Sequence, residues 1–493
     1  MTQFPSLRIY RLRYWTMPKY LIKGGNVLLF NEEKRTSFPK LDILIEDNII
    51  SKIGPDLDFK DPTLEIIDAT DHIVSPGFID GHRHVFQSQL RTTVGDHIFL
   101  DYCAHLLQGR MTFLDADDMY LAQLSGASEA IWCGVTTVMD HSHVIMSRDY
   151  ATRCIDATVE SGIRSIYCVA PFANPQSLNP MVLPDMDVKH PEQIELFKSL
   201  SRQTPLGGPK NDGRVMLGLG FDTMNHRPVD ESRDVLQYAK DNGIHVTCHD
   251  VDRFNLPSLE FLRNNALPLP PMTLSHTCEP DQGRIDFVRR NDIGIISTPE
   301  SELAMSHGVP SAFEFLRSGC SIGLGIDSPA ICGGDMFFCM RIALQSQRAR
   351  ENATYHARNK LPKEVKSRVD EVLYMATLGG AHAIHREKEI GSLEVGKLAD
   401  IVLIRTDSPS MVSSVNYGPA MVMHCHPTDV STVMINGEIV KRDGKLLRVD
   451  WDKLAGKLKE NRQVLEARWS DVDWDVTKSE LTKLWHMGEA LED

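Results

Sequence analysis

The chain lacks the long apolar run that a membrane-spanning helix needs. Such a helix takes about 20 consecutive apolar residues, and no stretch of the 493 residues approaches that length. There is no basic excess either, since 53 Lys and Arg stand against 67 Asp and Glu, a formal net charge of −14. These absences argue against a membrane protein and against a general binder of nucleic acid or anionic membranes. They leave a small-molecule substrate as the expected partner.

Cysteine pairs of the CxxC type are also missing, although ten cysteines are scattered along the chain. Several lie inside apolar runs, which is typical of buried, reduced thiols in a soluble, cytoplasmic protein. The N-terminal segment has no secretory apolar region. Residues 1–16 hold three arginines and no acid, so we interpret them as a flexible extension or, alternatively, a short transit peptide.

Short β-rich segments alternate with helical patterns between about residues 73 and 385. This alternation is typical of βα units around a parallel sheet. Eight strands are expected, at Ile73–Asp80, Thr136–Asp140, Arg164–Val169, Val215–Gly220, His245–Cys248, Met272–Ser275, Gly294–Ser297 and Ser321–Gly325. Helices are expected between them, for example at Asp117–Trp132, Glu231–Asp241, Asp281–Asn291 and Ala312–Ser318. Eight is the number of strands that closes a (β/α)8 TIM barrel.

Further β-rich segments at both ends of the chain predict a second, smaller domain. They are Tyr20–Leu29, Leu41–Ile45, Ile49–Ile53, Ala399–Ile404, Val430–Ile435 and Glu438–Val440. We therefore predict an α/β fold in which residues 17–72 and 386–450 form a small β-sandwich beside a barrel of residues 73–385. Residues 451–493 are predicted to be a C-terminal helical tail, packed on the surface or on a partner subunit and without a catalytic role.

Histidine and aspartate side chains follow several of the predicted barrel strands. His82 and His84 end the first motif at positions i and i+2, whose side chains point to one side of a strand. His249, His276 and Asp327 follow three later strands. A barrel assembles its active site at these carboxyl ends. Imidazole and carboxylate suit Zn²⁺, with Fe²⁺ as the main rival.

Three motifs carry a resemblance to a known family: Pro76–His84, Ile390–Val402 and Val433–Gly437. With them the chain resembles the amidohydrolase superfamily over residues 18–450. Within it, the chain is similar to the branch of cytosine, guanine and S-adenosylhomocysteine deaminases and triazine chlorohydrolases.

The resemblance implies roles for the residues at the strand ends. The implied metal ligands are His82, His84, His249 and Asp327. Asp327 is also implied to accept the proton of the activated water, while His276 holds that water or the substrate. Two-metal members of the family carry a modified Lys at the end of strand 4. Leu217–Asp222 holds no Lys, so one zinc ion per chain is expected.

The strand-5 region departs from the deaminase pattern. Deaminases of this branch usually carry Glu three residues after the strand-5 histidine, where it shuttles a proton to the substrate ring. Here that position is Asp252, one methylene shorter, and we take it as the first candidate for the general acid/base. Asp250 and Glu302 are the alternatives.

Other polar residues near the strand ends are candidates for substrate binding. The candidates are His141, Gln87, His226 and Glu302. His143 lies in the same Asp140–His143 motif as His141, and hydrogen bonding to the ligands is the alternative role for this pair. Arg83 should point away from the side that its two histidine neighbours share, and we expect it to form a structural ion pair.

Together these residues predict a metal-dependent hydrolase that attacks a C–N bond of a small heterocyclic substrate, with deamination as the leading reaction. Hydrolysis of a C–Cl bond or a cyclic amide, and lyase or isomerase chemistry, stay open on the same barrel. A non-enzymatic scaffold is the least favoured reading, because such a scaffold would be expected to lose ligands. We expect a homo-oligomer, either a dimer or a tetramer.

Overall fold

Eight parallel strands form the central sheet of the computed structural model, which describes residues 19–485. They are β8 (Phe78–Arg83), β9 (Val135–Ser142), β10 (Arg164–Val169), β13 (Val215–Gly220), β14 (His245–His249), β15 (Met272–Ser275), β16 (Gly294–Ser297) and β17 (Ile322–Leu324). Each pairs with its neighbour in this order. Two backbone hydrogen bonds of 2.9 Å, from His84 to Asp327 and from Asp327 to His82, join the last strand to the first. The predicted (β/α)8 barrel is confirmed.

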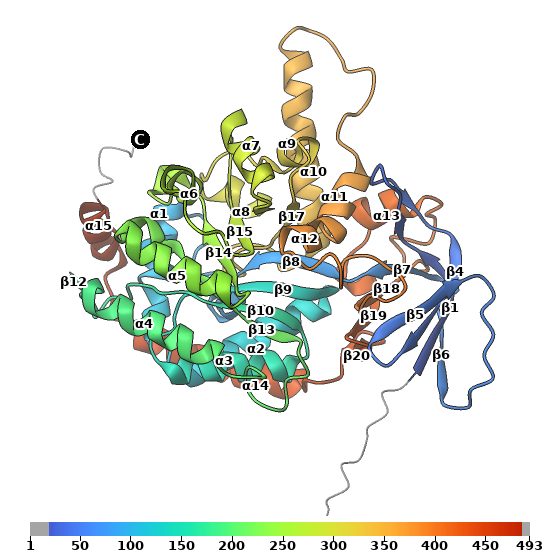
Figure 1. The fold of residues 1–493 in the computed structure, drawn as a ribbon, viewed down its shortest axis with the longest axis horizontal. Coiled ribbons are helices and arrows are strands. Elements are labelled where there is room, and N and C mark those ends of the chain that lie inside the picture. The colour runs from blue at the N-terminus through green and yellow to red at the C-terminus, as the bar shows by residue number, and fades with distance from the viewer. Residues whose placement is uncertain (1–18, 486–493) are drawn as a thin grey trace, which may run out of the picture.

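A helix follows each barrel strand, and these helices surround the sheet (Figure 1). They are α2 (Ala116–Trp132), α3 (Arg148–Ser161), α4 (Met186–Ser201), α5 (Val229–Asp241), α6 (Ser258–Asn265), α7 (Gln282–Arg290), α9 (Ala312–Arg317) and α10 (Met336–His356). Local sequence sets their ends. Asp115 caps α2 by accepting hydrogen bonds from the backbone N–H groups of Asp117 and Asp118, and α3 ends at Gly162, whose φ of 83° favours glycine.

Shorter helices fill the connections between these elements. They are α1 (Phe99–Tyr102), α8 (Pro299–Ala304), α11 (Val369–Met375), α12 (Leu378–Ala383) and α13 (Tyr417–Met423). Helix α12 packs across the bottom of the barrel against β8, β16 and β17. The long helix α10 projects from the top of the molecule as drawn in Figure 1.

Both ends of the chain build a second, nine-stranded sheet, at the right of Figure 1. Its strands are β1 (Lys19–Val27), β4 (Lys40–Glu46), β5 (Ile49–Gly54), β6 (Leu64–Asp68), β7 (His72–Pro76), β18 (Ile401–Arg405), β19 (Val430–Ile435), β20 (Glu438–Arg442) and β21 (Lys445–Leu446). Strand β1 pairs with β4, β6 and β7, so the sheet branches there. Ile22 and Ile45 share one core with Ile401 and Met434. The predicted small β-domain formed from both ends of the chain is confirmed, and its nine strands form one branched sheet.

The strand predicted at Ile73–Asp80 is in fact two strands, β7 and β8. The break falls at Gly77, whose N–H bonds the carbonyl of Asp400, whereas the next N–H, of Phe78, bonds the carbonyl of Gly134. A Cβ at Gly77 would lie 2.0 Å from the Thr136 side chain. The chain therefore leaves the terminal sheet and enters the barrel within one residue, at a position that has no room for a side chain.

The C-terminal tail packs on the chain's own barrel. It consists of α14 (Trp451–Arg468) and α15 (Trp474–Leu484). Leu465, Trp469 and Leu481 are buried in a cluster with side chains of the barrel loops. Lys478 of α15 also forms a 2.6 Å ion pair with Asp101 of α1. The predicted extension of residues 1–16 lies outside the described residues.

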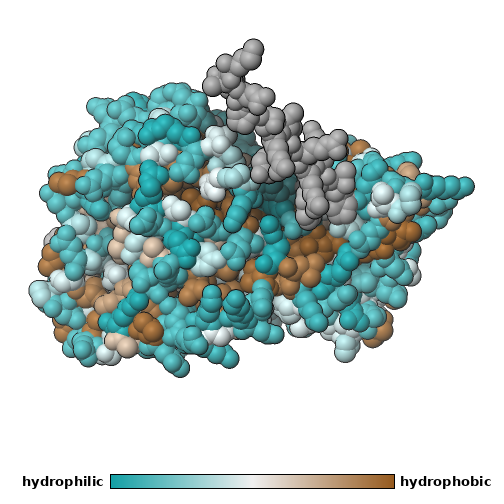
Figure 2. Space-filling model, turned by 90° about the horizontal axis from the view of Figure 1, so that it is seen from below, coloured by the Kyte–Doolittle hydropathy of each residue, from teal (hydrophilic) through white to brown (hydrophobic). Residues whose placement is uncertain are grey.

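The surface in Figure 2 is mainly hydrophilic, with apolar residues in small groups between the polar ones. Such scattered apolar exposure is normal for a folded protein. In the described part of the chain, no helix is long and apolar enough to cross a membrane.

Gly294→Ala should destabilise the fold. A Cβ at Gly294, at the start of β16, would lie 1.8 Å from the carbonyl oxygen of Ala383 in α12. Overpacking of this kind costs about 1–3 kcal/mol, so we expect a lower melting temperature by circular dichroism. The matched control is Gly456→Ala in α14, where a Cβ meets nothing within 4 Å. It should be neutral or stabilise by up to about 1 kcal/mol. Equal melting temperatures for the two variants would contradict the close packing of α12 on β16.

Candidate metal centre

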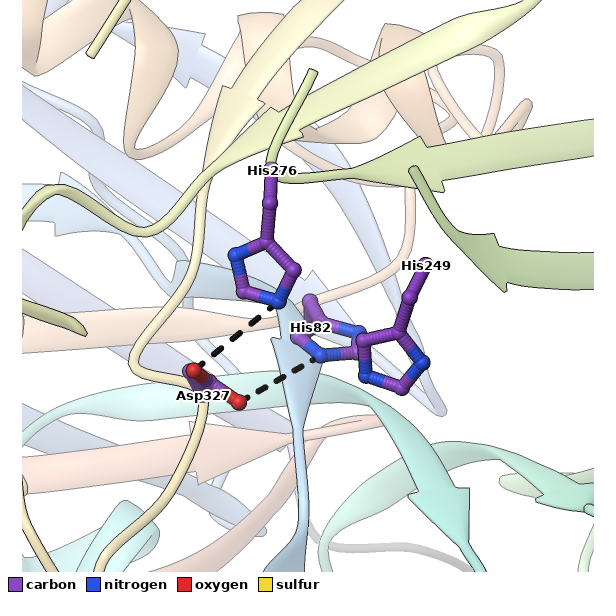
Figure 3. Close-up of side chains that lie close together, drawn as sticks. All are labelled: His82, His249, His276 and Asp327. Atoms are coloured by element: carbon purple, nitrogen blue, oxygen red, sulfur yellow. Dashed lines mark ion pairs between the residues drawn. The ribbon is translucent and has the colours of Figure 1, made fainter. Parts of the chain in front are cut away.

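Four potential metal ligands meet at the carboxyl ends of the barrel strands. One donor atom from each of His82, His249, His276 and Asp327 lies within 4.8 Å of the others. Figure 3 shows the three imidazoles around the carboxylate. His82 Nε2 is 3.5 Å from Asp327 Oδ1, and His276 Nε2 is 3.9 Å from Asp327 Oδ2. We call these four residues the primary group.

His84, the other half of the predicted HxH pair, borders the primary group. Its Nε2 lies 3.2 Å from Asp327 Oδ1 and 3.4 Å from His249 Nε2. Its Nδ1 is 2.7 Å from the carbonyl oxygen of His141. Because a carbonyl can only accept, Nδ1 carries the proton and Nε2 has a free lone pair. The backbone contact thus orients His84 as a possible metal ligand.

The protonation states of these residues suit a divalent metal ion. His82 is 1% exposed, and neither of its ring nitrogens has a hydrogen-bond partner among the described residues. Burial lowers the pKa of His82 to about 3, so the imidazole is neutral, as metal binding requires. Burial alone would raise the pKa of Asp327, but the imidazoles of His276, His82 and His84 hold it well below its usual value. The primary group therefore combines a neutral His82 with an ionised Asp327. Burial opposes the charged form of His249, but the carboxylates of Asp222 and Asp327 raise its pKa overall.

Two residues of the primary group have an unusual backbone. His276 and Asp327 have φ angles of 65° and 67°, in the left-handed region. Such a conformation costs about 1–3 kcal/mol in a non-glycine residue and is concentrated at functional sites. Hydrogen bonds hold both turns in place, from His276 N–H to the carbonyl of Ile296 and from Asp327 N–H to that of His82. His276 directly follows β15 and Asp327 comes three residues after the end of β17, and in this conformation both side chains reach the primary group.

Asp222 is a site residue that the sequence analysis missed. It follows β13, and its Oδ2 lies 2.8 Å from His249 Nδ1 and 3.0 Å from His141 Nε2. Its Oδ1 accepts a 2.8 Å hydrogen bond from the backbone N–H of His249. Burial opposes ionisation, but His249 and His141 keep the pKa of Asp222 well below its usual value. Asp222 therefore holds the Nδ1 proton of His249 and leaves Nε2 free for a metal. Its position just after the fourth barrel strand is the sequence signal that points to it.

A cavity of about 500 Å³ opens onto the primary group. His84, His249, His276 and Asp327 form part of its wall. Much of the remaining wall is apolar and includes Phe99, Phe172, Phe254, Met305, Leu484 and Trp485. Leu484 and Trp485 belong to the C-terminal tail, for which the sequence analysis expected no role in the site. An apolar cavity with a few convergent polar groups is typical of small-molecule sites.

The predicted substrate contacts are distributed unevenly around this cavity. His226 lines it, and so does His143. His141 is fully buried behind the wall. Gln87 is also fully buried, donates to the Tyr102 hydroxyl at 2.8 Å and accepts from Ser328. Direct substrate contact by His141 and Gln87 stays a prediction.

Glu302 lies behind His276 rather than in the wall of the cavity. It accepts hydrogen bonds from Ser297 Oγ at 2.9 Å and from the Thr298 N–H at 2.7 Å. Thr298 Oγ1 in turn lies 2.7 Å from His276 Nδ1. Burial raises the pKa of Glu302 to about 7. Its contacts position Thr298 and through it His276, and a direct substrate contact stays a prediction.

Asp252, the predicted proton shuttle, points away from the large cavity. Its carboxylate pairs with Arg284, and 42% of its side chain is exposed. It lines a separate cavity of about 140 Å³ together with Asp250, His276 and His307. Asp250 is buried and accepts a hydrogen bond from the backbone N–H of Leu259. A shuttle role for Asp252 stays a prediction that its position does not favour.

Arg83, between the two histidines of the first motif, has the structural role predicted for it. Its guanidinium is fully buried and lies 3.2 Å from Asp80 and 2.6 Å from Glu129. These ion pairs fix β8 against α2 and point Arg83 away from the primary group.

Comparison with known proteins places this site in a family. A profile described as the amidohydrolase family matches residues 73–250 and 258–440, more than half of the chain. A 5-methylthioadenosine/S-adenosylhomocysteine deaminase of Carboxydothermus hydrogenoformans is 26% identical over 459 residues, which cover 90% of this chain and 98% of the relative. A 5'-deoxyadenosine deaminase of Methanobrevibacter smithii is 25% identical over 434 residues, covering 84% and 91%.

A solved structure shares the fold over nearly the whole chain. It is the atrazine chlorohydrolase of Arthrobacter aurescens TC1 complexed with zinc, with a TM-score of 0.76, 20% identity, and coverage of 90% of this chain and 100% of that one. At this identity the likeness supports the fold alone. The profile match and the relatives confirm the prediction of an enzyme that hydrolyses carbon–nitrogen bonds. The chain belongs to the amidohydrolase family.

Proposed function

We propose that this amidohydrolase is a zinc-dependent deaminase of a small heterocyclic amine. The observation that carries the proposal is the primary group at the polar end of a largely apolar cavity. The apolar wall suits a flat aromatic ring, and the primary group lies where the exocyclic amino group of such a ring would be attacked. Two relatives named as deaminases of adenosine derivatives support the same reaction class.

In this proposal His84 and three members of the primary group, His82, His249 and Asp327, hold one zinc ion, with Fe²⁺ as the alternative. When bound, zinc acts as a Lewis acid and makes water nucleophilic near neutral pH. The related chlorohydrolase was solved with zinc, which supports zinc over iron. Asp222 keeps His249 in the tautomer that binds a metal.

Side chains in and around the primary group would transfer the protons, stabilise the developing charge and contact the substrate. Asp327, which is ionised, accepts a proton from the attacking water and delivers it to the departing amine. Thr298 Oγ1 lies 2.7 Å from His276 Nδ1. With the hydroxyl as donor, His276 Nε2 carries a proton and can donate it to the negative charge that develops on the ring. His226 and His143, from the cavity wall, contact the substrate.

The position of Asp252 favours a second candidate, hydrolysis of a C–Cl bond. Loss of an amine requires a proton on the leaving group, whereas chloride leaves without one. Asp252 is paired with Arg284 outside the large cavity. The cavity wall therefore lacks the additional acid that would protonate the substrate ring during deamination. The chlorohydrolase fold supports the same alternative.

A substrate screen separates the two candidates. We would incubate the zinc-loaded protein with aminated purines and pyrimidines, halogenated triazines and cyclic amides, and measure ammonia and chloride release. Ammonia from an aminated ring supports deamination, and chloride without ammonia supports the alternative. Turnover of cyclic amides alone would overturn both. The proposal includes a homo-oligomer, dimer or tetramer, which light scattering of the same preparation would test.

Loss of a primary ligand should remove the tightly held ion. In His82→Ala, His249→Ala or Asp327→Ala the donor set loses one member, so we expect loss of the ion that survives dialysis, and loss of activity, with an unchanged circular dichroism spectrum. His226→Ala is the matched control, because His226 lines the cavity outside the donor group. It should keep the ion. Full occupancy of the tight site in His249→Ala would exclude this ligand set.

Asp252→Asn should change kcat by less than about tenfold, below the 10²–10⁴ range for loss of a general acid or base. The reason is that the carboxylate is paired with Arg284 and does not face the large cavity. The measurement is kcat on the substrate found in the screen, with metal content checked in parallel. A fall of 10² or more with full metal content would instead establish Asp252 as the proton shuttle. Asp252→Glu would then be expected to retain activity.

A further inference from the structure

A second cluster of ligand-type side chains lies on the other side of His249 from the primary group. His141 and His143 come from β9 and its end, Asp222 follows β13, and one donor atom from each lies within 4.8 Å of the others and of His249. We propose that His141, His143 and Asp222 bind a second divalent transition-metal ion. The expectation of a single ion rested on the missing Lys after the fourth barrel strand and did not consider the aspartate found there.

The spacing of the three side chains fits one ion. Asp222 Oδ2 lies 3.0 Å from His141 Nε2 and 3.9 Å from His143 Nε2. Ligands at 2.0–2.2 Å from a tetrahedral zinc ion stand about 3.3 Å from one another, and the two observed distances bracket this value. An ion therefore fits between Asp222 and either histidine with side-chain shifts of a few tenths of an ångström, and the donors of the two histidines lie within 4.8 Å of each other.

Unpartnered nitrogens are the second observation that points to a ligand. Both ring nitrogens of His141 and Nδ1 of His143 have no hydrogen-bond partner among the described residues, and the two residues are 0% and 4% exposed. His141 Nε2 is directed at Asp222 without hydrogen-bond geometry. Leaving a buried polar atom unpaired costs about 1–3 kcal/mol. An ion beside Asp222 would engage Nε2 of His141, one of these three atoms, together with Nε2 of His143.

His249 separates the two clusters. Its Nε2 is 3.4 Å from His84 Nε2, on the primary side, whereas its Nδ1 donates to Asp222 Oδ2 at 2.8 Å. A carboxylate oxygen has lone pairs for both that hydrogen bond and a metal. The second ion would thus have three protein ligands of its own.

The fourth coordination position would open to the cavity, because His143 and Asp222 line its wall. Three protein ligands with an open position are typical of metal sites that meet a substrate or water. Imidazole and carboxylate donors suit Zn²⁺, Co²⁺ or Fe²⁺. We expect this site to bind more weakly than the primary group, which has one more protein ligand.

The experiment is a metal titration of the full-length protein. The protein is stripped with a chelator and titrated with Co²⁺, and binding is followed by visible absorption and by metal analysis after gel filtration in buffer that contains Co²⁺. We expect two ions per chain in the unaltered protein, one of which survives metal-free dialysis. His143→Ala and His141→Ala should each bind one ion, the dialysis-resistant one. His226→Ala, a histidine of the same wall outside both clusters, should still bind two.

His82→Ala makes the complementary test, since it should lose the dialysis-resistant ion and keep the weaker one. Saturation of the unaltered protein at one ion overturns the second site and leaves the proposed function intact. Two ions in both His141→Ala and His143→Ala overturn it as well. No bound ion at all overturns both this site and the zinc-dependent function. Circular dichroism identifies any variant that has not folded, and the other histidine variant then decides.

Discussion

The closure of the barrel at Asp327 is the constraint on which the rest of the site depends. The backbone of this residue joins β17 to β8 through hydrogen bonds with His82 and His84. Its side chain contacts the imidazoles of the same two histidines and that of His276. The same residue therefore closes the barrel between β17 and β8 and belongs to the donor group. A change that opens the seam also separates the ligands, which explains why the strained φ of Asp327 is maintained.

A buried ion pair between Asp80 and Arg83 also stabilises the junction of β17 with β8. Asp80 lies two residues before His82. It accepts a hydrogen bond from the Ile326 N–H and forms an ion pair with Arg83. Arg83 reaches on to Glu129 of α2. Burial raises the pKa of Asp80 to about 6, so Arg83 is needed to keep the carboxylate charged near neutral pH. Removing one partner of such a pair leaves an unpaired buried charge and lowers the stability of the fold by about 3–5 kcal/mol.

How much of this could be predicted from the sequence depends on whether the signal is local. The barrel strands and the residues at their ends could be found, because strand periodicity and the position after a strand are local properties. The break at Gly77 could not be found, since it depends on hydrogen bonds to Asp400 and Gly134, which precede β18 and β9 and lie far away in the chain. The same holds for Trp485, which reaches the cavity only through the packing of α15. The position of Asp252, three residues after His249, indicated that it lies near the fifth strand. It carried no information on the pairing of Asp252 with Arg284.

The charge balance of the cavity limits what it can hold. Among the described residues of its wall, Asp222 and Asp327 are the two carboxylates, and they stand among six histidines and two arginines, Arg227 and Arg253. Burial keeps His276, His143 and His307 neutral at pH 7 by lowering their pKa values. A buried dication is costly unless anions pair with it, so each carboxylate anchors one place where a cation is tolerated. Asp327 provides this place beside the primary group and Asp222 beside His141. A substrate that carries its own positive charge would compete for the same two places, so the proposed function favours a neutral heterocycle over a cationic amine.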